Sequence, residues 1–295
     1  MRSVPVLDSL GYTLGDLLCR VLPVPALYGL AHGLADLCYS VNRPARRAVC
    51  ANLAVVLGPR APRKRIQALG RRVFRNFAER LVDFLRLRTL PPEELERAFD
   101  VEGREHLDRA VESGAPVLFL TAHLGNWEWG AAWLGRKGVL QAVVARRHAA
   151  DSVERLFQRR REASGLRVFG ERNSAPGVLG LLRSGGTVGM LVDRDVTHEG
   201  ATADFFGRPT RMPRAHVSLA LRSGAVILPG FVVREPGGRQ RLIFEPPLDP
   251  RELGSREGGL EACLKVLEKY IRRYPEQWMV FEPVWPEPTG RLQWA

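Results

Sequence analysis

From residue 116 onward, short apolar segments rich in strand-forming residues alternate with segments of helical periodicity. Strands are predicted at residues 116–121, 140–145, 166–169, 187–192 and 225–233, and helices between them at 127–136, 151–164, 175–184 and 213–223. Parallel strands need a crossover of helix length, so this alternation is typical of a mainly parallel sheet covered by helices. The sequence therefore predicts an α/β fold with a mostly parallel central sheet flanked by helices.

The segments before and after this region are predicted to add two strands and further helices. A lead-in strand is predicted at 99–102, a hairpin strand at 241–245 and a closing helix at 259–274. Residues 62–88 carry apolar side chains at steps of three and four, which predicts a long amphipathic helix that stops at Pro91-Pro92. A short connecting helix should follow. We expect a helical N-terminal region at 1–97 and an α/β domain at 98–295.

The N-terminal region bears on membrane binding. Fifteen uncharged residues lie between Arg20 and Asp36, but a spanning helix needs about 20 predominantly apolar residues, and Pro23 and Pro25 interrupt this run. Acidic residues early in the chain also argue against a cleavable signal. We predict two helices, at 10–22 and 26–41, that lie on a membrane interface or dip into it. The alternative is that they only pack on the rest of the protein.

The charge balance favours an anionic partner. The chain of 295 residues has 44 Lys and Arg against 32 Asp and Glu, for a net charge of +12. Arginine-rich clusters lie at residues 43–47, 60–65, 71–75 and 159–161. No aromatic RNA-binding signature or zinc-finger spacing accompanies them, so an anionic membrane surface is favoured over nucleic acid. The four cysteines are widely spaced, which indicates free thiols in a reducing compartment.

The candidate site is the segment from His123 to Glu128, directly after the predicted strand 116–121. Gly125 can supply a tight turn, and Asn126 is a good N-cap for the helix that follows. A carboxylate beside a neutral imidazole fixes its tautomer and stabilises the imidazolium that forms when it takes a proton. His-X4-Glu alone is a weak signal, because two such residues often occur at this offset by chance. The tryptophans at 127, 129 and 133 indicate either a pocket or ordinary core packing.

Several segments together carry a family resemblance. Residues 121–128 read Thr-Ala-His-Leu-Gly-Asn-Trp-Glu, 192–195 read Val-Asp-Arg-Asp, 204–207 read Asp-Phe-Phe-Gly and 276–278 read Glu-Gln-Trp. With the strand segment in 220–234, this ordered set resembles the bacterial lipid A biosynthesis acyltransferases. That family includes late lauroyl and myristoyl transferases and the phosphatidylinositol mannoside acyltransferase. The resemblance covers most of the chain, about residues 43–285.

The resemblance implies a glycerolipid acyltransferase-like fold, with residues 98–295 as the catalytic domain. It implies an enzyme that moves a fatty acyl chain from acyl carrier protein or coenzyme A to a hydroxyl of a glycolipid or phospholipid. His123 would be the general base and Glu128 would orient it. No Gly-X-Ser-X-Gly elbow is present, so a covalent serine route has no support. Asn126 is a predicted substrate-binding residue, since amides near Gly125 and Asn126 are candidate oxyanion donors.

Further substrate-binding residues are predicted at two strand ends. Asp193, Arg194 and Asp195 follow the strand 187–192 and could position a polar head group or fix arginines. Arg146 follows the strand 140–145 and could bind a phosphate or a carbonyl oxygen, with Arg147 as its rival. A solvated turn and a surface ion pair are the plain alternatives. Asp-X-Asp also suggests magnesium, but no third ligand is evident, so we expect no metal and no cofactor besides the thioester co-substrate.

The predicted partners are a lipid acceptor, an acyl carrier protein or coenzyme A thioester, and an anionic membrane surface, without nucleic acid. The predicted location is the cytoplasmic face of the bacterial inner membrane, with peripheral or shallow insertion. Two alternatives stay open: a thioesterase that uses the same pair of residues, and a non-catalytic protein that binds anionic lipid. Phe205 and Phe206 either plug the core or line the acyl slot.

Overall fold

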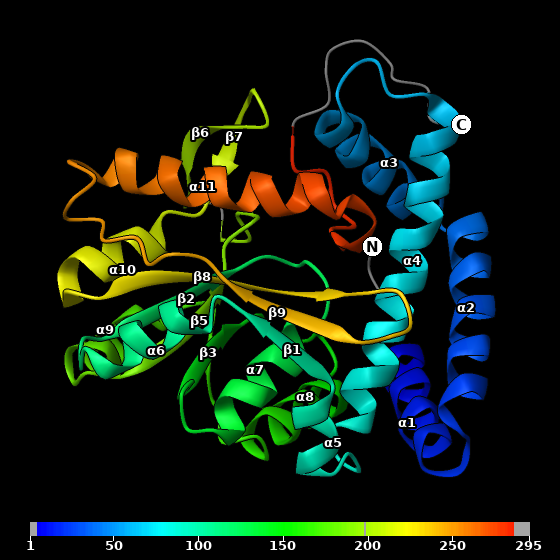
Figure 1. The fold of residues 1–295 in the computed structure, drawn as a ribbon. Helices are drawn as coiled ribbons and strands as arrows, with labels where there is room; N and C mark the ends of the chain where they lie inside the picture. Colours follow the sequence, from blue (N-terminus) through cyan, green and yellow to red (C-terminus); the bar gives the residue numbers. More distant parts are fainter. Residues whose placement is uncertain (1–4, 198, 286–295) are drawn as a thin grey trace.

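A seven-stranded sheet forms the centre of the computed structural model, which describes residues 5–197 and 199–285 (Figure 1). The strand order is β1-β9-β8-β2-β5-β3-β4, and only the β8–β9 pair is antiparallel. The strands are β1 (Phe99–Glu102), β2 (Val117–Thr121), β3 (Ala142–Ala145), β4 (Arg167–Gly170), β5 (Thr187–Leu191), β8 (Val226–Arg234) and β9 (Gln240–Phe244). The predicted α/β fold with a mostly parallel sheet is confirmed.

Helices cover both faces of this sheet. One face carries α6 (Arg104–Glu112), α7 (Trp127–Arg136) and α8 (Asp151–Glu162), and the other carries α9 (Ala175–Arg183), α10 (Ala215–Ser223) and α11 (Arg256–Arg273). Strand β2 shows why both faces must be covered, because its side chains alternate between two cores. Val117 and Phe119 enter the core under α7, whereas Leu118 and Leu120 enter the core under α11. Helix α6 was not predicted.

Within the described residues, five helices precede the first strand. They are α1 (Pro5–Val21), α2 (Val24–Val41), α3 (Arg43–Leu57), α4 (Arg63–Arg86) and α5 (Pro92–Arg97). In Figure 1, α1, α2 and α4 stand together beside the end of the sheet, and α2 packs along α4. The predictions at 10–22, 26–41 and 62–88 are confirmed as helices, but α3 was missed. No helix within the described ranges is long and apolar enough to cross a bilayer.

A small hairpin interrupts the alternation of strands and helices. Strands β6 (Ala201–Phe205) and β7 (Arg208–Met212) pair in antiparallel fashion, with Phe206 and Gly207 between them. Both turn residues have positive φ, at 57° and 71°, as a two-residue hairpin of type I′ requires. This hairpin was not predicted from the sequence, because a phenylalanine rarely takes this backbone conformation and the segment lacks a usual turn sequence.

The two adjacent phenylalanines belong to the core. Phe205 is fully buried and Phe206 is 9% exposed. The Phe205 ring stacks on Trp285 with centroids 5.6 Å apart, and the Trp285 indole N–H donates to the Phe205 carbonyl. Of the two roles considered for this pair, plugging the core is therefore the one that the structure supports.

We expect Phe205→Ala to lower the free energy of unfolding by about 3–5 kcal/mol, the usual range for removing a buried phenylalanine. Urea denaturation monitored by tryptophan fluorescence measures this change. Val111→Ala is the control, because Val111 is 40% exposed and its truncation should stay within about 0.5 kcal/mol. A loss below about 1 kcal/mol for Phe205→Ala would contradict the core assignment.

Candidate active site

The candidate site begins with a pair of residues beyond the ends of two neighbouring strands. Strands β2 and β5 are parallel and pair Thr121 with Leu191, so the residues two positions further on, His123 and Asp193, also face each other. The Nδ1 atom of His123 lies 2.7 Å from one Asp193 oxygen, and the His123 backbone N–H donates to the other at 3.1 Å. The register of the sheet thus assembles an imidazole–carboxylate pair.

A third donor to Asp193 comes from the C-terminal part of the chain. The indole N–H of Trp278 donates to Asp193 at 2.8 Å, and both side chains are buried. The same segment holds the backbone of the turn. The Met279 N–H donates to the His123 carbonyl at 2.7 Å, and the Gly125 N–H donates to the Gln277 carbonyl at 2.9 Å. Trp278 was not predicted as a site residue, since only the family resemblance drew attention to its segment.

The pKa of Asp193 indicates which nitrogen of His123 carries a proton. Burial works to raise the pKa of Asp193, but the neighbouring His123 and the Trp278 N–H lower it to about 2. An ionised carboxylate only accepts hydrogen bonds, so Nδ1 of His123 must carry the proton and donate it. The lone pair is then on Nε2, which has no hydrogen-bond partner among the described residues. His123 is about one-fifth exposed, so a substrate hydroxyl can reach it.

The turn after His123 needs a glycine. Gly125 has a φ of 59°, and a Cβ there would lie 1.7 Å from the Val232 carbonyl oxygen, so no other residue fits without moving β8. Helix α7 then starts with Asn126 as its N-cap, as predicted. The Asn126 side chain accepts from the Trp129 N–H and donates to Asp83 at 2.8 Å. It is 2% exposed and its polar atoms are used within the protein, so substrate binding by this side chain is not supported.

Glu128 does not orient His123, which corrects the predicted dyad. Its two oxygens accept from Arg161 of α8, at 2.6 and 3.2 Å, in a bidentate pair. Burial works to raise the pKa of Glu128, but the Arg161 guanidinium holds it below the usual range. After the turn at Gly125, α7 places Glu128 toward α8, while the sheet register brings Asp193 to the imidazole. The orienting contact was therefore assigned to the wrong carboxylate.

The second aspartate of the Asp-X-Asp segment organises the hairpin. Asp195 accepts from the Gly200 N–H at 2.9 Å and from the Thr197 hydroxyl at 3.2 Å, and its side chain is nearly buried. Arg211 of β7 pairs with it at 3.5 Å. Alternate residues along a strand end thus serve different purposes: Asp193 holds the imidazole and Asp195 holds the loop. A direct contact of Asp195 with substrate stays a prediction.

The predicted substrate-binding arginines differ in their surroundings. Arg194 is 22% exposed and donates to Glu282 at 3.1 Å, while its buried Nε has no hydrogen-bond partner among the described residues. Arg146 is 57% exposed and pairs only distantly with Glu171. It follows β3, which lies beside β5, so it is at the same edge of the sheet as His123. Its rival Arg147 lies in an exposed ion pair with Asp151.

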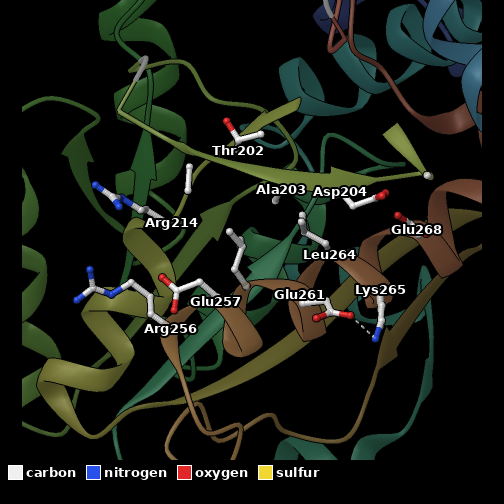
Figure 2. Close-up of a pocket in the computed structure, with 13 residues that line it drawn as sticks. Thr202, Ala203, Asp204, Arg214, Arg256, Glu257, Glu261, Leu264, Lys265 and Glu268 are labelled. Atoms are coloured by element: carbon white, nitrogen blue, oxygen red, sulfur yellow. Dashed lines mark ion pairs between the residues drawn. The ribbon is translucent and has the colours of Figure 1, made fainter. Parts of the chain in front are cut away.

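A pocket of about 460 Å³ lies apart from this pair, between the β6–β7 hairpin and α11. Figure 2 shows its mixed lining, with Arg214, Arg256 and Glu257 at one end and the Glu261–Lys265 ion pair on α11. Neither His123 nor Asp193 is among the lining residues. Because the pocket does not include the His123–Asp193 pair, we do not assign it to the reaction site.

Comparison with known proteins shows which family this chain resembles. The model of the bacterial lipid A biosynthesis acyltransferase family matches residues 5–287. A phosphatidylinositol mannoside acyltransferase of Mycobacterium tuberculosis is 31% identical over 69% of this chain and 66% of that protein. One of Mycolicibacterium smegmatis is 28% identical over 94% of this chain and 91% of that protein. A lipid A biosynthesis palmitoleoyltransferase of Escherichia coli K12 is 28% identical over 64% and 62%.

The family match spans all the elements described above, from α1 to the segment that carries Trp278. It includes the β2–α7 turn with His123 and the end of β5 with Asp193, which the resemblance in the sequence had also singled out. We conclude that this chain belongs to the bacterial lipid A biosynthesis acyltransferase family.

Proposed function

We propose that the protein is a membrane-associated O-acyltransferase that moves a fatty acyl chain from an acyl carrier protein or coenzyme A thioester to a hydroxyl of a glycolipid or phospholipid. The observation that carries this proposal is the contact between His123 and the buried Asp193, which leaves Nε2 as the basic nitrogen. The names of the relatives, with phosphatidylinositol mannoside and lipid A in them, support an acceptor of this kind.

In the proposed reaction, Nε2 of His123 takes the proton of the acceptor hydroxyl while the oxygen attacks the thioester carbon. The carbon–sulfur bond then breaks, and the imidazolium returns the proton to the leaving thiolate. Asp193 stabilises the imidazolium that forms between these steps and keeps the ring in one orientation. An ester and a free thiol result, and no group on the enzyme becomes acylated.

Two apolar stripes on the N-terminal helices support membrane association. Their members are spaced four, three and four residues apart and each is more than half exposed: Leu10, Leu14, Leu17 and Val21 on α1, and Leu30, Leu34, Leu37 and Val41 on α2. This spacing puts each set on one face of its helix. Among the described residues, Val111 is the one other large exposed hydrophobic side chain. Such a concentrated apolar surface is typical of a binding site for a lipid surface.

Basic residues accompany these stripes. Arg43, Arg46 and Arg47 follow α2 directly, and each basic residue near an anionic bilayer contributes about 1 kcal/mol to binding. We therefore propose that the protein binds the cytoplasmic face of the bacterial inner membrane, as a peripheral or shallowly inserted protein. Its four free cysteines are consistent with a reducing compartment.

The proton transfer predicts that Asp193→Asn lowers kcat by about 10²–10⁴-fold, because an amide neither stabilises the imidazolium nor fixes the productive tautomer. His123→Ala should fall in the same range. The assay is transfer of a labelled acyl group to a bacterial lipid extract, with folding checked by circular dichroism. Near-normal transfer by either variant would overturn the mechanism. Release of free fatty acid at a rate that does not depend on added lipid would instead identify a thioesterase.

Trp278→Phe tests the third donor to Asp193. Phenylalanine keeps most of the packing but removes the N–H, so kcat should fall about 10-fold or more while KM changes little. Trp285→Phe is the matched control, since that indole bonds the Phe205 carbonyl and not Asp193. Equal kcat values for the two variants would show that Trp278 acts through packing alone.

Membrane binding can be tested on vesicles of phosphatidylglycerol and phosphatidylcholine. Replacing Leu30, Leu34 and Leu37 by serine should weaken binding by at least about 100-fold, because each leucine buried in lipid contributes about 1.5–3 kcal/mol. Changing Arg43, Arg46 and Arg47 to glutamine should weaken it about 10–100-fold at 0.1 M salt, and less at higher salt, where charges are screened. Val111→Ser is the control. Unchanged binding of the leucine variant would refute the proposed surface.

A further inference from the structure

A buried arginine next to the candidate site lacks an acidic partner. Arg80 of α4 is 6% exposed, and its Nε is sealed from solvent without a hydrogen-bond partner. The guanidinium carbon lies 4.3 Å from the ring centroid of Trp127 and 4.9 Å from that of Phe77. The guanidinium thus packs against two aromatic rings. No carboxylate in the described part of the chain lies within ion-pair distance of Arg80.

The acidic residues around Arg80 are already occupied. Both oxygens of Glu128 accept from Arg161. Asp83, one turn further along α4, accepts from Tyr28 and Asn126 and pairs with Arg234. Glu128 is therefore paired with Arg161 and not with Arg80, and the charges of Glu128 and Asp83 act on Arg80 only at longer range. Among the described residues, Arg80 is left without a direct ion-pair partner.

Aromatic contacts offset only part of the cost of this burial. A cation over an indole ring is attracted by the ring quadrupole, but this attraction is weaker than an ion pair in the same surroundings. Burial also lowers the pKa of Arg80, although an arginine keeps its proton at neutral pH. A buried arginine without an ion-pair partner in the unliganded protein calls for an explanation, and one explanation is a site that binds an anionic ligand.

The position of Arg80 relates it to the proposed base. The Trp127 ring contacts the Arg80 guanidinium and also the His123 imidazole. The centroids of the Trp127 and His123 rings are 5.3 Å apart and their planes make an angle of 73°. One indole thus separates the unpaired cation from the residue that activates the acceptor. An anion paired with Arg80 would belong to a molecule bound at the reaction site.

We propose that Arg80 binds a phosphate group of a substrate, which in the bound state supplies the direct anionic partner that Arg80 lacks. This inference rests on the proposed function, because both proposed substrate classes carry phosphate esters, in the lipid head group or in the phosphopantetheine arm of the donor. The planar guanidinium suits a phosphate, which it can bind through two parallel N–H groups.

The first test is a binding measurement that needs no turnover. The melting temperature of the full-length protein is recorded with coenzyme A, with phosphatidylinositol vesicles and with phosphatidylcholine vesicles as reference. The wild type should gain several degrees with one phosphate probe, and Arg80→Met should gain none. Arg72→Met, an exposed arginine on the same helix, should respond like the wild type. The probe that stabilises tells whether the donor or the acceptor supplies the phosphate.

The melting temperatures of the variants without ligand distinguish a ligand-binding role of Arg80 from a purely structural role. Arg80→Met should melt at the same temperature as the wild type or higher, because it removes an unpaired buried charge. A marked fall in melting temperature with an unchanged probe response would overturn the proposal. Arg80→Lys keeps the charge and covers the case in which the methionine variant does not fold. It should fold and respond to the probe less than the wild type, and a full response would also overturn the proposal.

Kinetics give an independent readout. Arg80→Met should raise KM for the phosphate-bearing substrate about 10- to 100-fold, the range expected for losing a charge-assisted hydrogen-bonded pair, with kcat within a few-fold. An unchanged KM would refute the binding role. If the wild type transfers no acyl group but still responds to a phosphate probe through Arg80, the proposed function fails and the anion site stands.

Discussion

A carboxylate with no exposed surface, that of Asp193, holds together three parts of the chain that are far apart in sequence. It accepts from the backbone and the ring of His123 and from the indole of Trp278, and so joins the ends of β2 and β5 to the C-terminal segment. Burying a carboxylate costs several kcal/mol unless hydrogen bonds replace the lost water. Since two of these donors belong to His123 in the turn itself, the turn cannot shift without leaving a buried charge short of hydrogen bonds.

A second buried carboxylate holds the other side of the same turn. Asp83 accepts from Asn126, which caps α7, and pairs with Arg234 at the end of β8. Gly125 lies between His123 and Asn126 in the chain and touches the backbone of β8, where no side chain would fit. The four residues from His123 to Asn126 are therefore fixed from both sides, which is the kind of support that an imidazole needs to keep its orientation.

Local patterns predicted the elements well, because strands buried on both faces and amphipathic helices leave clear periodicities in the sequence. The β6–β7 hairpin was missed because its turn uses Phe206, a residue type that seldom takes positive φ. The partner of His123 could not be found locally either. It depends on which strand lies beside β2, and residue spacing alone favoured Glu128 over Asp193. The same holds for Trp278, whose contact joins positions 85 residues apart.

Helix α2 connects the proposed membrane surface to this turn. Its outer face presents Leu30 and Leu34, while Tyr28 on its inner side donates to Asp83 at 2.5 Å, and Asp83 in turn binds the cap of α7. The contacts between the outer surface and the site run through packed helices and buried hydrogen bonds rather than through a loop. With the stripes on a bilayer, the height of His123 above the lipid would be set by the packing of α2 on α4.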